Sequence, residues 1–217
     1  MKIPNLALAL VLTPLGLFAG PDRTPVDQVV QAPAVRGVAP FNTVDDGGFE
    51  AGTPNPVWAE ASTNFGTPLC TIGSCGAGGG SGPHAGTYWA WFGGIAAPET
   101  GSVAQPIQIT NGLPATIDFF LEIPVASGNG VDFLELQLDG TPVWSVLENA
   151  PGFMTYAPVS VDISAYADGA AHTLTFFSTI TGSATTNFFV DDVSLNLPIF
   201  GDGFETGDTS AWSGTQP

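Results

Sequence analysis

Apolar and polar residues alternate along several short segments of the chain, which is the pattern of strands with one buried face. Every second residue is apolar in residues 117–123 and again in residues 134–138. Asp139-Gly140 then predicts a hairpin turn into a strand over residues 143–146. Further strand-like segments follow at residues 159–163, 173–180 and 188–197. No segment has a convincing helical period, so we predict an all-β chain folded as an antiparallel jelly-roll β-sandwich.

The β-rich pattern covers residues 41–197, and the flanking segments differ from it. Residues 1–19 have a lysine followed by an apolar run, which predicts a secretory signal peptide and a secreted or extracellular location, free or at the cell surface. An uncleaved membrane anchor is the alternative, disfavoured by the short, proline-interrupted run. Residues 20–40 are proline-rich and predict a linker or disordered arm. Residues 198–217 form a tail that resembles a signature at the ends of some bacterial exported proteins, or a dispensable extension.

Cys70 and Cys75 are the two cysteines of the chain and lie five residues apart. In an oxidising compartment they would close a small local loop, so we predict a disulfide. A zinc site is disfavoured because two further ligands would be needed.

The charge balance excludes one class of partner and suggests another. The chain has three lysines and arginines against twenty acidic residues, a net charge of −17. Such a surface repels phosphate backbones, which excludes nucleic-acid binding. After Arg36 there is no lysine or arginine, and only His84 and His172 can pair with the many carboxylates. Buried carboxylates then need hydrogen bonds, protons or a metal ion, so a divalent cation is an expected partner.

The glycine-rich residues 76–86 predict a flexible loop, because a phosphate cradle would need a lysine and a following helix. Several motifs around this loop occur in a fixed order: Gly47-Gly48-Phe49-Glu50, Trp58, residues 86–94, residues 105–107, residues 132–140, residues 161–167 and residues 188–195.

This series resembles the galactose-binding-like jelly rolls, especially carbohydrate-binding modules and related accessory domains of bacterial secreted proteins. The resemblance implies that the two ends of the module lie side by side and share a structural calcium ion, with Glu50 and Asp191 as side-chain ligands. Strand parity gives an independent reason to expect a metal ion at Asp191. Its carboxylate shares a strand face with apolar Phe189, Val193 and Leu195, so it should point into the core, where no lysine or arginine can pair with it. Oxygen ligands suit calcium. The alternative is a twist or bulge that turns the carboxylate to solvent.

Aromatic residues are the candidates for ligand binding, because sugar rings stack on flat aromatic faces. Trp89 and Trp91 share one face of their strand, and we predict that this face is a solvent-exposed binding surface. Trp144, Glu135 and Gln137 near the Asp139-Gly140 turn are a second candidate group. The alternative is that these tryptophans are packed in the core and the polar pair is simply solvated.

Catalysis has little support in the sequence. No nucleophile motif accompanies the histidines. Glu122, Asp132 and Glu135 could form a glycosidase pair, but they make no tight cluster. We therefore predict that the chain is not an enzyme but a secreted, calcium-stabilised protein that binds carbohydrate or a cell-surface glycan. A structural or adhesive cell-surface protein that binds another protein through the same aromatic face is the alternative.

Overall fold

The computed structural model describes Arg23 and residues 43–197 of the chain. Two five-stranded antiparallel sheets face each other, with strand orders β1-β4-β9-β6-β7 and β2-β3-β10-β5-β8, here called the first and second sheets. The strands are β1 (Ala59–Ser62), β2 (Leu69–Thr71), β3 (Tyr88–Gly93), β4 (Glu99–Gln108), β5 (Thr116–Val125), β6 (Phe133–Leu138), β7 (Thr141–Leu147), β8 (Ala157–Asp162), β9 (Ala171–Ile180) and β10 (Asn187–Asn196). The predicted jelly-roll β-sandwich is confirmed.

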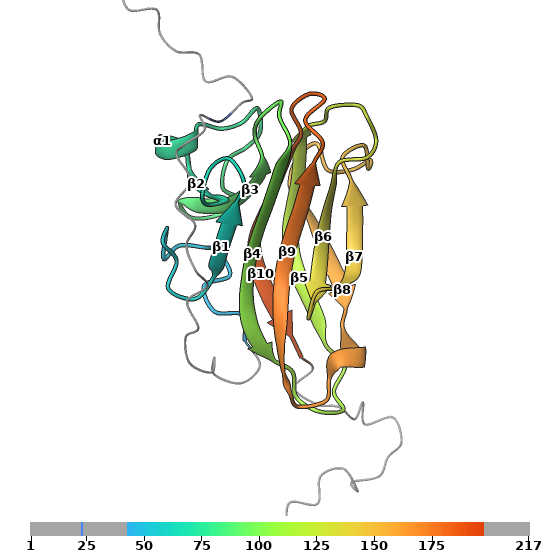
Figure 1. The fold of residues 1–217 in the computed structure, drawn as a ribbon. Coiled ribbons are helices and arrows are strands. Elements are labelled where there is room, and N and C mark those ends of the chain that lie inside the picture. Colours follow the sequence, from blue (N-terminus) through green and yellow to red (C-terminus); the bar gives the residue numbers. More distant parts are fainter. Residues whose placement is uncertain (1–22, 24–42, 198–217) are drawn as a thin grey trace, which may run out of the picture.

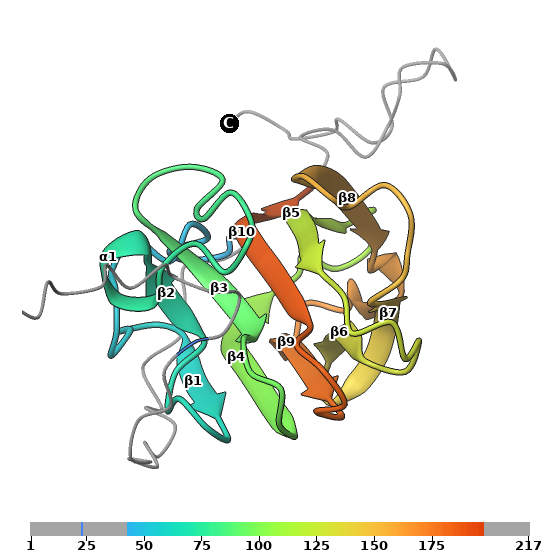
Figure 2. The same cartoon turned by 90° about the horizontal axis from the view of Figure 1, so that it is seen from above.

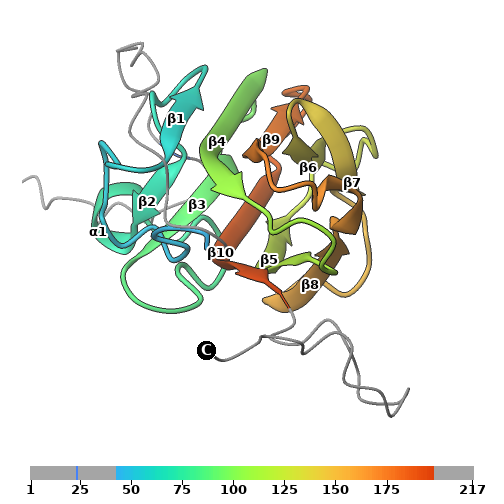
Figure 3. The ribbon, with the colours of Figure 1, turned by 90° about the horizontal axis from the view of Figure 1, so that it is seen from below.

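The two sheets stack as layers, with the first sheet seen face-on in Figure 1 and both sheets seen from their ends in Figures 2 and 3. Strands distant in sequence lie side by side, because β10 runs between β3 and β5 and β9 between β4 and β6. Helical structure in the described residues is limited to α1 (Ile72–Cys75) and the 3-10 turn η1 (Ser164–Tyr166). No helix among the described residues is long and apolar enough to cross a membrane.

The main core fills the space between the sheets and follows the predicted alternation. In β6 the three leucines are fully buried and the residues between them are partly exposed. Phe119 and Phe176 meet in this core edge to face, with ring centroids 5.0 Å apart.

The predicted signal peptide (1–19) and the C-terminal tail (198–217) lie outside the described residues. Of the predicted linker (20–40), Arg23 alone is described, and it is buried against the sandwich.

Candidate functional site

Trp89 and Trp91 do not form the predicted solvent-exposed surface. Both are fully buried, and with Cys70 and Phe189 they make a second apolar cluster on the outer side of the second sheet. The indole rings lie nearly parallel, with centroids 6.3 Å apart. Strand alternation placed the two tryptophans on one face correctly, but that face is covered by another part of the chain.

The cover over this cluster is the glycine-rich segment predicted to be a flexible loop. Ser81 donates from its backbone and hydroxyl to Glu122, and Asn187 donates to the Gly78 carbonyl at 2.7 Å. Tyr156 donates to the Gly82 carbonyl at 2.7 Å. The segment is therefore packed on the sheet, and its glycines allow the backbone to approach the aromatic rings closely.

The predicted disulfide is confirmed, since Cys70 and Cys75 are bonded. Cys70 lies in β2 with its side chain in the buried tryptophan cluster, and Cys75 is the last residue of the short helix α1. Thr71 caps this helix and accepts from the Ser74 amide. The bond thus fixes the start of the glycine-rich segment to the sheet that it covers.

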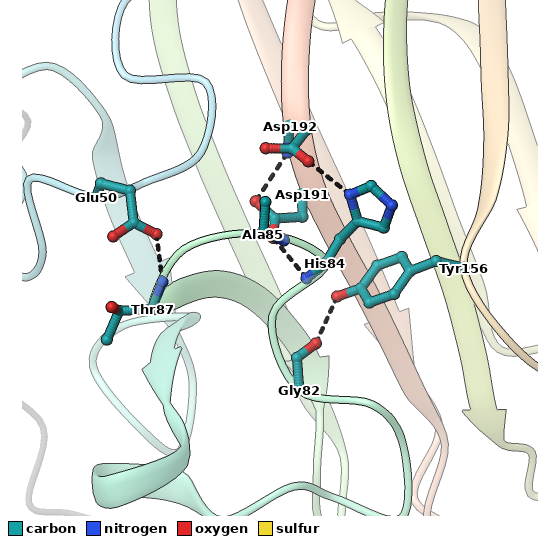
Figure 4. A network of polar contacts seen from close by, with 8 residues as sticks. All are labelled: Glu50, Gly82, His84, Ala85, Thr87, Tyr156, Asp191 and Asp192. Carbon is teal, nitrogen blue, oxygen red and sulfur yellow. Dashed lines mark hydrogen bonds and ion pairs between the residues drawn. The ribbon is translucent and has the colours of Figure 1, made fainter.

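Glu50 and Asp191, the predicted metal ligands, lie on either side of one tight turn that leads into β3 (Figure 4). Asp191 Oδ2 accepts from the amides of His84 and Ala85, at 2.8 and 3.2 Å. Glu50 Oε1 accepts from the amides of Thr87 and Tyr88, at 2.7 and 2.9 Å. The two carboxylates therefore hold the turn from both ends.

Gly48 lies between these two carboxylates. A β-carbon on Gly48 would lie 3.6 Å from Glu50 Cγ and 4.0 Å from Asp191 Oδ1. Val193 donates its amide to the carbonyl of Gly47 at 2.9 Å, so the segment around residue 48 runs beside β10. The beginning and end of the described sandwich thus meet at this place, as the resemblance implied.

Asp191 is fully buried, but not on the face that strand parity predicted. The pairing of β10 with β5 shifts register between Asp191 and Ser194, and Asp192 has a φ of 51°. Because this bulge reverses the alternation, Val193 points into the main core whereas Asp191 points outward, beneath the turn into β3. The prediction that Asp191 and Val193 share a face was wrong.

Burial raises the pKa of Asp191 to about 7, while amide hydrogen bonds from Asp192, Ala85 and His84 oppose the rise. The neighbouring Asp192 binds His84, with 2.6 Å between its Oδ2 and the ring Nδ1. The His84 ring also stacks on Phe120, with centroids 3.7 Å apart. The sequence did not predict the contact between His84 and Asp192, because more than one hundred residues separate them along the chain.

The described residues contain no group of three or more His, Cys, Asp or Glu side chains arranged to hold a metal. Within the described chain, both hydrogen bonds to Glu50 end on Oε1, which leaves Oε2 for another partner. Calcium in proteins takes six to eight oxygen ligands, many of them backbone carbonyls. Glu50 and Asp191 could supply side-chain oxygens, and the surrounding turn would have to supply the others.

A different surface presents partly exposed aromatic rings. The outer side of the first sheet carries Phe133, Glu135, Gln137, Leu147 and Phe177, which we call the Phe133–Phe177 face. The two phenylalanine rings are partly exposed, with centroids 6.3 Å apart and planes inclined by 45°.

Polar and small residues surround these rings. Cross-strand pairing places Phe177 between Ser102 of β4 and Glu135 of β6. The Gln137 amide donates to Glu135 at 2.7 Å, so the predicted polar pair does lie beside an aromatic surface. Phe177 was not predicted from the sequence, because its neighbour Phe176 is equally aromatic and the pattern alone does not decide which of the two faces solvent.

Trp144, the remaining predicted aromatic, lies elsewhere. It is opposite Leu136 on the core side of the first sheet, half-buried, and meets Phe119 edge to face at 5.3 Å. The structure therefore does not bring Trp144 onto the surface that holds Glu135 and Gln137.

The three acids considered for catalysis are not brought together. Glu122 lies on the outer side of the second sheet, where burial raises its pKa. Glu135 lies on the opposite outer surface of the sandwich. Asp132 is enclosed with Glu148, and the Thr186 hydroxyl contacts both carboxylates, at 2.6 and 2.7 Å.

Neither a protein-family profile nor a curated protein matches this chain in sequence. Solved structures that are similar include TmCBM61 in complex with β-1,4-galactotriose, at 16% identity and a TM-score of 0.49, over 73% of this chain and 99% of that one. The CBM22-1 xylan-binding domain of Paenibacillus barcinonensis Xyn10C is 14% identical, with a TM-score of 0.39, over 74% and 97%.

The K1 cleaved adhesin domain of Lys-gingipain from Porphyromonas gingivalis W83 is 11% identical, with a TM-score of 0.47, over 71% of this chain and 97% of that one. Enzymes are similar as well, including a cyclase from Fischerella sp. TAU. At these identities the likeness concerns the fold and assigns no function.

Proposed function

We propose that this chain is a secreted, noncatalytic carbohydrate-binding protein whose Phe133–Phe177 face holds the sugar. The observation that carries the proposal is the pair of partly exposed rings, 6.3 Å apart on a regular sheet surface. Aromatic side chains offer a large flat contact area for the apolar faces of sugar rings. The Glu135–Gln137 pair beside them adds acceptors and donors for sugar hydroxyls.

The charge of the protein restricts the class of ligand. With a net charge of −17, the protein repels acidic polysaccharides unless a cation bridges them. The proposed ligand is therefore a neutral or basic glycan. Binding on such an open surface is expected to be weak, with a Kd in the micromolar to millimolar range, about −8 to −4 kcal/mol.

A structural calcium ion at Glu50 and Asp191 is part of the proposal. Both carboxylates lie where the ends of the sandwich meet, and no lysine or arginine follows Arg36 to neutralise them. A cation there would compensate the burial of Asp191 and fix the turn into β3. Its role would be to stabilise the fold rather than to contact the sugar.

A glycan array tests the proposal, using the purified protein with calcium and with chelator. The protein should bind neutral or basic glycans, and the double variant F133A/F177A should lose this binding while melting close to the parent protein. Met154→Ala is a matched control, because Met154 is the most exposed large apolar residue described, at 73%, and lies off the proposed face. Failure of the parent protein to bind any glycan would refute the function, whereas binding by the double variant would refute the face.

A further inference from the structure

Arg23 belongs to the segment before the sandwich, yet the residue is buried, with only 8% of its surface exposed. Its guanidinium donates to two backbone carbonyls, from Nη1 to Trp91 at 3.0 Å and from Nη2 to Thr67 at 3.1 Å. Its backbone amide donates to the carbonyl of Gly94. Three carbonyls at the end of β3 and in the loop before β2 therefore hold one arginine at both its main chain and its side chain.

The walls of this slot fit a flat cation. The guanidinium carbon lies 4.2 Å from the centre of the Phe65 ring and 5.2 Å from that of Trp91, within the range of cation–π attraction. A β-carbon on Gly94 would lie 2.5 Å from Arg23 Cδ, so the slot has room for the arginine stem only because residue 94 is glycine.

The electrostatics also favour a cation. Burial lowers the pKa of Arg23 to about 10, and the negative charge of Glu99 opposes the fall, so the side chain stays protonated at neutral pH. Glu99 is itself only 3% exposed and accepts from Ser62 and from the amides of Thr63 and Asn64. A buried charge is tolerated only where hydrogen bonds and opposite charge compensate it, and this slot supplies both.

We propose that the site formed by Phe65, Thr67, Trp91 and Gly94 recognises arginine. Arg23 of the same chain occupies this site and thereby anchors the chain at residue 23 to the sandwich. Lysine does not suit it, because one ammonium group cannot reach both carbonyls and lie flat against the rings. The site lies at the end of β3 and in the loop before β2, whereas the Phe133–Phe177 face lies on β6, β7 and β9 of the first sheet, so the two are separate.

A peptide of residues 20–27 added to the full chain carrying Arg23→Ala tests the site. The variant leaves every side chain of residues 43–197 intact, and circular dichroism checks its fold; Arg23→Lys serves as a second, more conservative receptor. By nuclear magnetic resonance titration, both variants should bind the peptide. The unaltered chain should bind it more weakly, because its tethered Arg23 competes at an effective concentration near the millimolar range; for a peptide Kd of about 0.1 mM the expected loss is about tenfold.

The same peptide with lysine in place of arginine is the control, and its affinity should fall at least about tenfold. No binding of the arginine peptide at about 1 mM would overturn the proposal. Equal binding of the two peptides, or equal binding by the variants and the unaltered chain, would also overturn it.

Discussion

The backbone of Gly78 rests directly on the indole ring of Trp91. A β-carbon on Gly78 would lie 2.5 Å from two carbons of that ring, closer than atoms can approach without displacement. Asn187 joins the two residues, because it accepts from Trp91 Nε1 at 3.0 Å and donates to the Gly78 carbonyl at 2.7 Å. The glycine-rich segment thus acts as a fixed cover that shields two tryptophans from water.

Replacing Gly78 by alanine should therefore destabilise the protein by about 2–4 kcal/mol. Part of this is the left-handed backbone, about 1–2 kcal/mol for a residue other than glycine, and the rest is overpacking against the ring. Gly140→Ala is the control, since Gly140 also has a positive φ but nothing lies within 4 Å of its added carbon. Denaturant unfolding should show the larger loss for Gly78→Ala, and equal losses would mean that the cover does not press on Trp91.

The sequence predicted the strands well because alternation reports which residues share a face. It did not predict which faces are covered, since both faces of β3 are buried, one by the other sheet and one by residues 76–86. The density of glycines beside an aromatic strand was an available signal of close backbone approach, but composition alone favoured a flexible loop.

The site was predictable only in parts. Glu50 and Asp191 were expected as ligands of one calcium ion from the family resemblance, and the structure places both carboxylates on the turn into β3. The ion itself stays a prediction. A bulge at Asp191 was named only as the alternative, because its presence depends on how β10 pairs with β5 rather than on local pattern, and the carboxylate it turns outward is buried, not solvated. Phe177 was missed for a similar reason, because two adjacent phenylalanines satisfy either phase of the alternation.

The disulfide should contribute modestly to stability. It closes a loop of only a few residues, so replacing Cys70 and Cys75 by alanine should lower the free energy of unfolding by about 2 kcal/mol. Mass spectrometry without reductant should show no free thiol in the parent protein. Alkylation of two thiols in the purified, folded protein would contradict the bond.

His172 should make stability depend on pH. Its Nδ1 lies 2.7 Å from Asp139 and its Nε2 lies 3.0 Å from Asp168, while Tyr166 packs edge-on against the ring. Burial alone would lower the pKa of His172, but the hydrogen bonds and charges of the two carboxylates outweigh it and raise the pKa. The resulting stabilisation is fully present below the unfolded pKa, about 6.5, and is lost as the pH rises through the raised folded value.

Unfolding of the parent protein and of His172→Gln at pH 6 and pH 9 measures this effect. Both aspartates are exposed to solvent, which screens the pairs, so the effect should be small. The variant should be less stable than the parent by a larger margin at pH 6 than at pH 9. A margin that is the same at both pH values would show that protonation of His172 does not matter to folding.

Calcium should raise the melting temperature if the proposed ion is present. At a concentration of about 100 times its Kd, the ion would add roughly 2.7 kcal/mol by mass action. Asp191→Asn should remove the difference between calcium and chelator, whereas Glu135→Gln, on the opposite outer surface of the sandwich, should keep it. Identical melting curves for the parent protein in calcium and in chelator, with no ion found by elemental analysis, would refute the site.

Phe176 and Phe177 are adjacent on β9 but should behave oppositely. Phe176 is fully buried against Phe119, so Phe176→Ala should destabilise the protein by about 3–5 kcal/mol. Phe177 is partly exposed, so Phe177→Ala should lower stability by less than about 1 kcal/mol while weakening glycan binding about tenfold or more.

Trp144→Ala should destabilise without a specific loss of binding, because Trp144 packs on Phe119 at the edge of the core. Melting curves and glycan affinities of the three variants test both expectations. Loss of binding by Trp144→Ala alone, with the fold intact, would place the glycan site at Trp144 rather than on the Phe133–Phe177 face.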